Sequence, residues 1–201
     1  GAANTLTTVA GIPFYKGDAN SMYTHDVSGT DSTATGNTAF GFNAMDAITT
    51  GDSNTAVGFS AASALTTGHS NVAVGTESLL ANTTGSANTA VGKEALIANT
   101  TASYNTAIGY RSLNSNTTGA SNTAVGTQAL QANTTAAGNV AVGQETLKAN
   151  TTGASNVAIG NGALIANTTG TRNIGIGANA YDASDTENDN LAIGIDAMSA
   201  N

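Results

Sequence analysis

The chain has 201 residues, a net charge of −8, one proline, 4% aromatic and 9% charged residues. An ordinary soluble protein is about one quarter charged, and a disordered chain usually carries high charge and many prolines, so the composition fits neither class. The five basic residues are scattered, which excludes nucleic-acid binding because that needs clustered Lys and Arg. No apolar run reaches the roughly 18 residues of a membrane-spanning helix. A repetitive structure remains.

The first 36 residues lie outside the regular pattern that fills the rest of the chain. Residues 1–19 show no signal peptide, and we expect them to form an N-terminal cap or connector. Residues 20–36 are expected to form a degenerate terminal coil, because Asn20 is in phase with the repeat and residues 31–33 fall where Asn-Thr-Thr should be. Terminal repeats are often atypical, since their outer face meets solvent or another domain.

Residues 37–201 form ten repeats of 17 residues without insertion or deletion, and the last is truncated. Asn opens every repeat, at Asn37, Asn54, Asn71, Asn88, Asn105, Asn122, Asn139, Asn156, Asn173 and Asn190. Gly is fifth in every repeat, at Gly41, Gly58, Gly75, Gly92, Gly109, Gly126, Gly143, Gly160, Gly177 and Gly194. A fixed period predicts coils that stack so that equivalent residues form columns. The fold class is therefore all-β, a parallel β-solenoid or β-roll.

Each coil is predicted to contain two short strands and two turns. The first strand is Asn-(Thr/Val)-Ala-(Val/Ile)-Gly, in which Thr89 and Val91 share one face and Ala90 points to the other. A second strand is expected in the Ala-Leu-x-Ala stretch, at residues 95–98. Gly-x-x and Asn-Thr-Thr-Gly have the composition of turns.

The regular spacing of small and polar residues along the chain predicts the structural role of each column. The Gly column supplies positive φ, close backbone approach, or both, and the Asn column can hydrogen-bond from coil to coil. Six Asn-x-Thr sequons are interpreted as another structural column in preference to glycosylation sites. They begin at Asn82, Asn99, Asn116, Asn133, Asn150 and Asn167.

The coil is thin, with two large apolar side chains such as Val91 and Leu96. Such a core is small against the conformational entropy of 17 ordered residues. One strand face can line the coil interior while the other meets neighbouring chains. We therefore expect the chain to need a partner, and a closed fibre of identical chains supplies one.

The Asn-x-Ala-(Val/Ile)-Gly-x-x-Ala unit resembles the head repeats of YadA-like trimeric autotransporter adhesins. The longer unit with Ala-Leu-x-Ala-Asn-Thr-Thr-Gly also looks like repeats of phage tail fibres. The resemblance covers residues 37–201 and implies a left-handed β-roll in a three-chain fibre. The resemblance does not decide between a bacterial adhesin and a phage tail fibre. Asn201 is twelfth in its coil, so we expect a fragment of a longer fibre.

A few acidic and histidine side chains have the chemistry of a possible catalytic site. Glu77 and Glu94 are at the seventh position of adjacent coils, and a retaining glycosidase uses two carboxyl groups about 5 Å apart. Any two equivalent residues of adjacent coils are about this far apart, however, so the spacing is not specific for catalysis. Arg111 is at the same position of the next coil and can balance the charge of the carboxylates. His25 and His69 are single. We expect no enzymatic activity and no cofactor, with a polysaccharide-cleaving spike as the alternative of another class.

Two further hypotheses are calcium binding and ice binding. A weak calcium candidate is formed by Asp182, Asp185, Glu187 and Asp189, although a solvated acidic loop is the simpler interpretation. Ice binding needs two Thr on one face of each coil. The adjacent Thr100 and Thr101 would point to opposite sides of a strand, so ice binding is a minor alternative.

Recognition is expected at the positions that vary between coils, which are the sixth, seventh, tenth, sixteenth and seventeenth. The candidate binding residues are Tyr104, Tyr110, Phe14, Tyr15 and Tyr23. We expect a homotrimeric, structural and adhesive fibre segment, extracellular on a bacterial surface or a virion, that binds a cell-surface glycan or protein receptor. The alternative is that this segment only separates other parts of the fibre and binds nothing. The segment is not expected to insert into a membrane.

Overall fold

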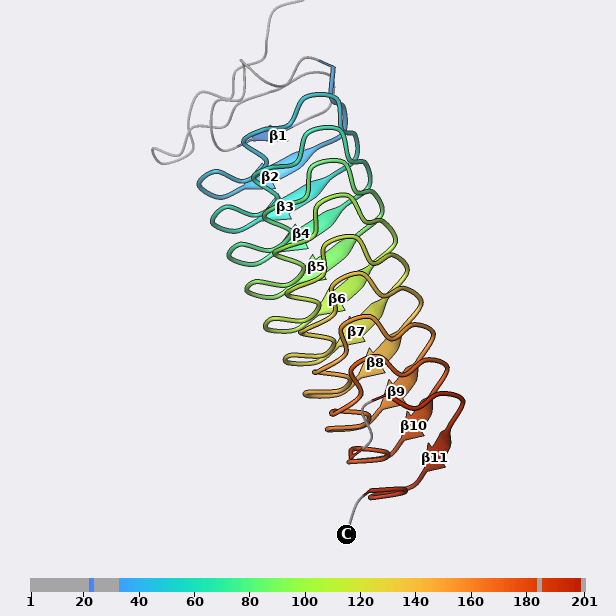
Figure 1. Ribbon diagram of the computed structural model, residues 1–201. Coiled ribbons are helices and arrows are strands. Elements are labelled where there is room, and N and C mark those ends of the chain that lie inside the picture. The colour runs from blue at the N-terminus through green and yellow to red at the C-terminus, as the bar shows by residue number, and fades with distance from the viewer. Residues whose placement is uncertain (1–21, 24–32, 184–185, 200–201) are drawn as a thin grey trace, which may run out of the picture.

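A computed structural model describes residues 22–23, 33–183 and 186–199, and one parallel sheet runs through all of it. The strands stack in sequence order from β1 to β11, one per coil, along one side of the rod (Figure 1). Their bounds are β1 Met22–Tyr23, β2 Thr38–Phe40, β3 Thr55–Val57, β4 Val72–Val74, β5 Thr89–Val91, β6 Thr106–Ile108, β7 Thr123–Val125, β8 Val140–Val142, β9 Val157–Ile159, β10 Ile174–Ile176 and β11 Leu191–Ile193. The prediction of an all-β, parallel β-solenoid is confirmed.

The register keeps the period from β2 to the last strand. Thr89 pairs with Thr106 and Ala90 with Ala107, and every other pair from β2 onward has the same offset. At the N-terminal end, Met22 pairs with Thr38, which is one residue short of the period. Asn20, used to predict the phase of the terminal coil, lies outside the described residues, as do residues 1–19 and His25.

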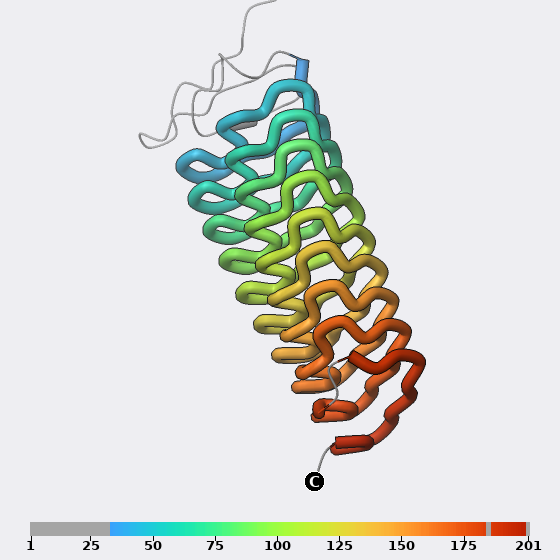
Figure 2. The backbone as a smooth tube through the Cα atoms, in the orientation of Figure 1, coloured from blue at the N-terminus to red at the C-terminus, as the bar shows by residue number. Residues whose placement is uncertain are grey.

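The interior is narrow, and the same positions fill it in coil after coil. Ala90, Ala95 and Leu96 are fully buried, and so are their equivalents Ala124, Ala129 and Leu130 two coils later. The backbone tube in Figure 2 shows the repeated outline of each coil around this interior. In the coils of β4–β9 one buried Leu is the main apolar group, because the strand contributes only Ala to the inside. Met45 and Ile48 take this role in the β2 coil, and Leu65 does so in the β3 coil.

The predicted second strand at residues 95–98 is wrong, because turns occupy this stretch in place of a strand. Ala95 and Leu96 are consecutive and both fully buried, whereas successive side chains of a strand point to opposite faces. The backbone brings both inward by using left-handed conformations at Glu94 (φ 58°) and Leu96 (φ 51°). Coil-to-coil hydrogen bonding continues through it, since the Leu96 N–H donates to the Ser112 carbonyl at 3.1 Å.

The Gly column combines positive φ with close approach of consecutive coils. Gly92 has φ of +133°, and a Cβ added there would lie 2.6 Å from the carbonyl oxygen of Gly109. Both conditions exclude a larger side chain, since a non-Gly residue is strained at this φ and the obstructing atom is backbone. The fifth position therefore admits only Gly.

The opening Asn is buried in every coil except that of β11, and it links three segments of backbone. Asn54 Nδ2 donates to Asn37 Oδ1 (3.1 Å) and to the Gly68 carbonyl (2.9 Å), and the Asn54 N–H also donates to Asn37 Oδ1 (2.8 Å). The same arrangement recurs at Asn71 on Asn54. This ladder fixes the coils at strand spacing and leaves the amide satisfied within the interior.

Candidate functional site

The outer face of the sheet, defined here as the second and fourth positions of β2–β11, is a regular surface that repeats in every one of these strands. In β6, Thr106 is half-buried, Ala107 is fully buried and Ile108 is 40% exposed. The same order of burial holds in β5, where Ala90 is inside and Thr89 and Val91 are half-buried. The interior therefore takes Ala, and the larger strand residues face outward.

The fourth position of this face holds only apolar residues. They are Phe40, Val57, Val74, Val91, Ile108, Val125, Val142, Ile159, Ile176 and Ile193. The tenth position, which is also half-buried in most coils, varies from Asp46 and Lys148 to Ile97. A side chain that faced only water in every coil would be expected to vary in the same way as the tenth position.

The second position divides the outer face into two zones. It is Thr in five of the six coils of β2–β7, with Val72 as the exception, and it is Val140, Val157, Ile174 and Leu191 in β8–β11. We call these the threonine zone and the aliphatic zone. The first can form hydrogen bonds to a partner or to water, and the second cannot.

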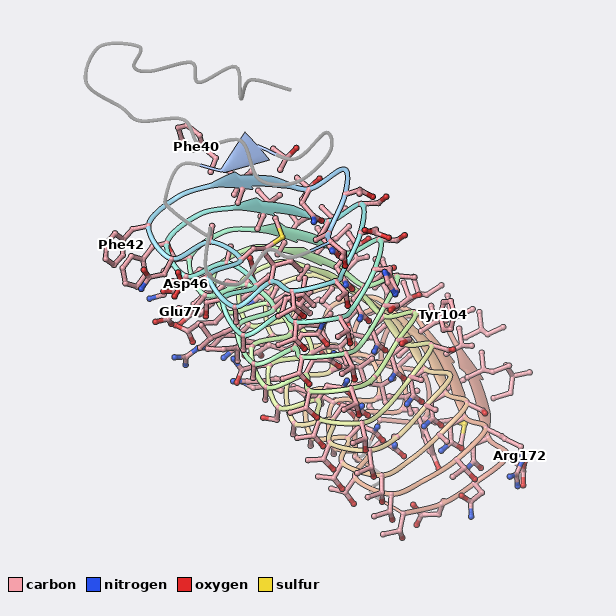
Figure 3. The ribbon with its side chains drawn as sticks, turned by 90° about the horizontal axis from the view of Figure 1, so that it is seen from above. Phe40, Phe42, Asp46, Glu77, Tyr104 and Arg172 are labelled. Carbon is pink, nitrogen blue, oxygen red and sulfur yellow. The ribbon has the colours of Figure 1, made fainter. Side chains whose placement is uncertain are left out.

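An aromatic pair at the sixth position was missed by the sequence analysis. Phe42 and Phe59 are 70% and 50% exposed, and their rings stack with centroids 5.9 Å apart at 12°. Figure 3 shows Phe42 toward the same flank of the rod as Asp46 and Glu77. The signal was available, because neither Phe occupies a position that is apolar in most coils.

Two of the predicted recognition residues are described in full, and both are exposed. Tyr104 is 70% exposed at a left-handed φ of 64°, and Tyr110 is 40% exposed, with the Arg111 guanidinium 5.1 Å from its ring centroid. Phe14 and Tyr15 lie outside the described residues, and only the backbone of Tyr23 is described, in β1. The two tyrosines flank the outward side chains of β6.

The seventh-position carboxylates are arranged for charge balance. Glu94 accepts from Arg111 Nε at 2.6 Å, and Lys93 Nζ lies 3.3 Å away on its other oxygen. The pKa of the Glu94 carboxyl is lowered, chiefly because Arg111 donates a hydrogen bond to it. A carboxyl that is held ionised in this way is a poor general acid.

The acidic segment after β10 is committed in part to an ion pair. Asp189 receives two hydrogen bonds from Arg172, at 2.6 and 2.8 Å, and this pairing lowers the pKa of its carboxyl. Asp185 lies outside the described residues, while Asp182 and Glu187 are described. Among the residues that the structure does describe, no group of three potential metal ligands is gathered.

The six sequon asparagines form a second buried ladder. Asn99 Nδ2 donates to Asn82 Oδ1 at 2.9 Å and to the Ala102 carbonyl at 3.0 Å. All six side chains are buried, so a glycan could not be attached in the folded chain. The following Thr100 donates its hydroxyl to the Thr117 carbonyl at 3.2 Å, whereas Thr101 is exposed. Each Thr-Thr pair therefore presents one exposed Thr, whereas ice binding needs two on one face of the coil.

A column of side-chain acceptors at the sixteenth position runs through part of the rod. The N–H of His69 donates to Ser86 Oγ (3.0 Å), and the N–H of Ser86 donates to Ser103 Oγ (2.9 Å). The next three coils have Ala120, Ala137 and Ala154 at this position, which offer no side-chain acceptor. The column resumes where Asn188 accepts from Thr171 N–H at 2.7 Å.

Comparisons with known protein families, with curated proteins and with solved structures found no match for this chain. None of the segments that the structure describes forms a helix with the length and apolar character needed to cross a bilayer.

Proposed function

We propose that this chain is a structural and adhesive segment of an extracellular fibre, on a bacterial surface or a virion, in which three parallel copies associate through their outer faces. The observation that carries the proposal is the fourth-position column, which is apolar in all ten coils and yet half-buried or exposed. A second and third copy would cover this column. The resemblance to trimeric adhesin and tail-fibre repeats agrees with that number of copies.

The composition of the fourth position is not explained by strand propensity alone. Thr is β-branched and suits strands as well as Val does, and it occupies the second position of five coils. It never occupies the fourth position. Selection against a hydroxyl at a position that is open in the single chain supports burial against another apolar surface.

The test of assembly is the molar mass in solution, measured by light scattering after gel filtration. We expect three times the chain mass of 19.6 kDa. Val91→Lys should lower the mass toward one chain, because it places a charge in the covered column, whereas Gln131→Lys at the tenth position should leave the mass unchanged. A wild-type monomer, or equal behaviour of the two variants, would contradict the proposal.

The adhesive part of the proposal is supported by the exposure of Tyr104 and Tyr110. Aromatic side chains give large contact area at low conformational cost, and a fibre of three chains repeats each contact, so weak contacts add by avidity. The variant with Tyr104→Ser and Tyr110→Ser should lose binding to cells or immobilised glycans without a change in melting temperature. A loss of stability without specific binding to lose would favour a spacer.

A further inference from the structure

The aliphatic zone of the outer face differs from the threonine zone in a way that the interior does not explain. Leu96 and Leu113 under the threonine zone and Leu147 and Leu164 under the aliphatic zone are all fully buried. Ala is the inward strand residue throughout, apart from Gly175. Since stacking is the same in both zones, the change from Thr to Val, Ile and Leu responds to something outside the chain.

The aliphatic zone also exposes more apolar side chains per coil. Val142 is 36%, Ile159 is 40% and Ile174 is 37% exposed, in three consecutive strands. The six strands of the threonine zone expose Phe40 (48%), Val72 (36%) and Ile108 (40%) to this extent. In five of the six coils of the threonine zone, the second-position Thr places a hydroxyl in the same strand as the apolar fourth-position residue. Apolar area removed from water drives association, so the two zones offer unequal driving force.

We infer that the outer face of β8–β11 is the surface through which copies of this chain bind each other most tightly, and that assembly starts there. The inference rests on the proposed function. It goes further by stating which part of the rod contributes most of the association free energy. The threonine zone then meets its counterparts later and more weakly, as a surface where water or hydrogen bonds can enter.

Three features favour a second copy of this chain as the occupant. The second and fourth positions carry no charge in any of the ten coils, although the chain has a net charge of −8, so identical faces meet without like-charge repulsion. A second copy has the same coil spacing, so columns match over the whole length. Any other partner would need to reproduce that spacing.

The length of the face also supports self-association. Ten coils of about 4.8 Å form a row roughly 48 Å long, which identical copies can share from end to end. A stable interface buries about 800 Å² per partner. The aliphatic zone alone is less than half of this face, so it can lead the association but needs the threonine zone to complete it.

The test compares two matched pairs of substitutions in the full chain. Val140→Thr with Val142→Thr changes the aliphatic zone in β8, and Val72→Thr with Val74→Thr makes the same two changes in β4, which lies in the threonine zone and has the same strand sequence. Each exchange replaces a methyl by a hydroxyl and keeps the shape and β-branching. Sedimentation velocity over a concentration series gives the protein concentration at half-association, and far-UV circular dichroism reports whether the coils remain folded.

We expect the aliphatic-zone pair to raise that concentration about tenfold or more and the threonine-zone pair about threefold or less. The reverse exchange, Thr106→Val with Thr123→Val, extends the aliphatic zone and should lower it. Equal effects of the two Val→Thr pairs, or a larger effect in the threonine zone, would overturn the inference while leaving self-association intact. A wild-type chain that stays monomeric at every concentration would overturn the proposed function as well, and would point to a different protein as the occupant.

Discussion

The six coils of the threonine zone and the four coils of the aliphatic zone are alike inside and different outside. In both zones the first position is Asn, buried in every coil except that of β11, and the fifth is Gly. The ninth position is a buried Leu in the six coils of β4–β9, and it is Met45, Ala62, Tyr181 and Met198 in the other four. On the outer face, the second-position column changes from Thr to aliphatic residues. The comparison teaches that coil stacking restricts the residues of the interior, whereas the residues of the outer face can vary with the surface that the rod contacts.

The largest effect is expected at the Gly column, and it should be the same in both zones. Gly126→Val and Gly160→Val should each destabilise by about 4 kcal/mol or more, because positive φ is strained for Val and its side chain would overlap the next coil. The matched control Gln131→Ser should change stability by less than about 0.5 kcal/mol. Thermal melting at fixed protein concentration measures all three, and a small loss at either Gly would break the column assignment.

A smaller loss, again equal in the two zones, is expected for the buried Leu column. Leu96→Ala and Leu147→Ala should each cost about 3 kcal/mol, because both side chains are fully buried and the narrow coil cannot collapse around the cavity. Urea unfolding of the two variants provides the measurement. If Leu147→Ala cost much more than Leu96→Ala, the interiors would differ and the comparison would fail.

The sixteenth-position column predicts a gain of stability in the middle of the rod. Ala137→Ser should place a hydroxyl where the Ala120 N–H can donate to it, as Ser103 does for Ser86, and should stabilise by about 1 kcal/mol. Ser86→Ala should lose a similar amount, because His69 N–H donates to that hydroxyl. The two melting temperatures should move in opposite directions, and a loss in both would contradict the account of this column.

The smallest effect is a pH dependence with the same sign in both zones. The pKa of Glu94 and that of Asp189 are lowered, chiefly by hydrogen bonds from Arg111 and Arg172 respectively. A carboxyl with a lowered pKa in the folded state contributes stability above its unfolded pKa, and this is lost as the pH falls through the folded value. Glu94→Gln and Asp189→Asn should therefore melt with a weaker dependence on acid pH than wild type. The Arg172–Asp189 pair is exposed, whereas the Glu94 side chain is only 12% exposed. Parallel curves for wild type and Asp189→Asn would show that solvent screens the exposed pair.

The sequence predicts the fold because one period controls it. The 17-residue spacing, the inward Ala and the Gly that admits no Cβ determine strand position and register directly. The second strand was predicted wrongly because Ala95 and Leu96 are adjacent apolar residues, which strand alternation cannot bury together. Left-handed backbone at non-Gly residues such as Leu96 depends on stacking between coils, and no local propensity indicates it.

The candidate surface could be predicted less completely. The variable positions were expected to face outward, and of those the structure describes, all but Ser60 and Gly162 are half-buried or exposed. The exposed pair Phe42 and Phe59 was missed, although the sixth position was expected to face outward and Tyr110 at the same position was predicted as a binding residue. Which strand face would be outside was left open, since Ala and Val are both apolar and only coil width decides between them.

The most direct test of the central claim is the distance between equivalent outer-face positions in different copies. The chain has no cysteine, so Val91→Cys introduces a single spin-label site in the fourth-position column, and Gln131→Cys introduces one at the tenth position. The account predicts short distances between Val91 labels by pulsed dipolar spectroscopy and longer ones between Gln131 labels. The absence of any dipolar coupling at Val91, or shorter distances at Gln131, would contradict it.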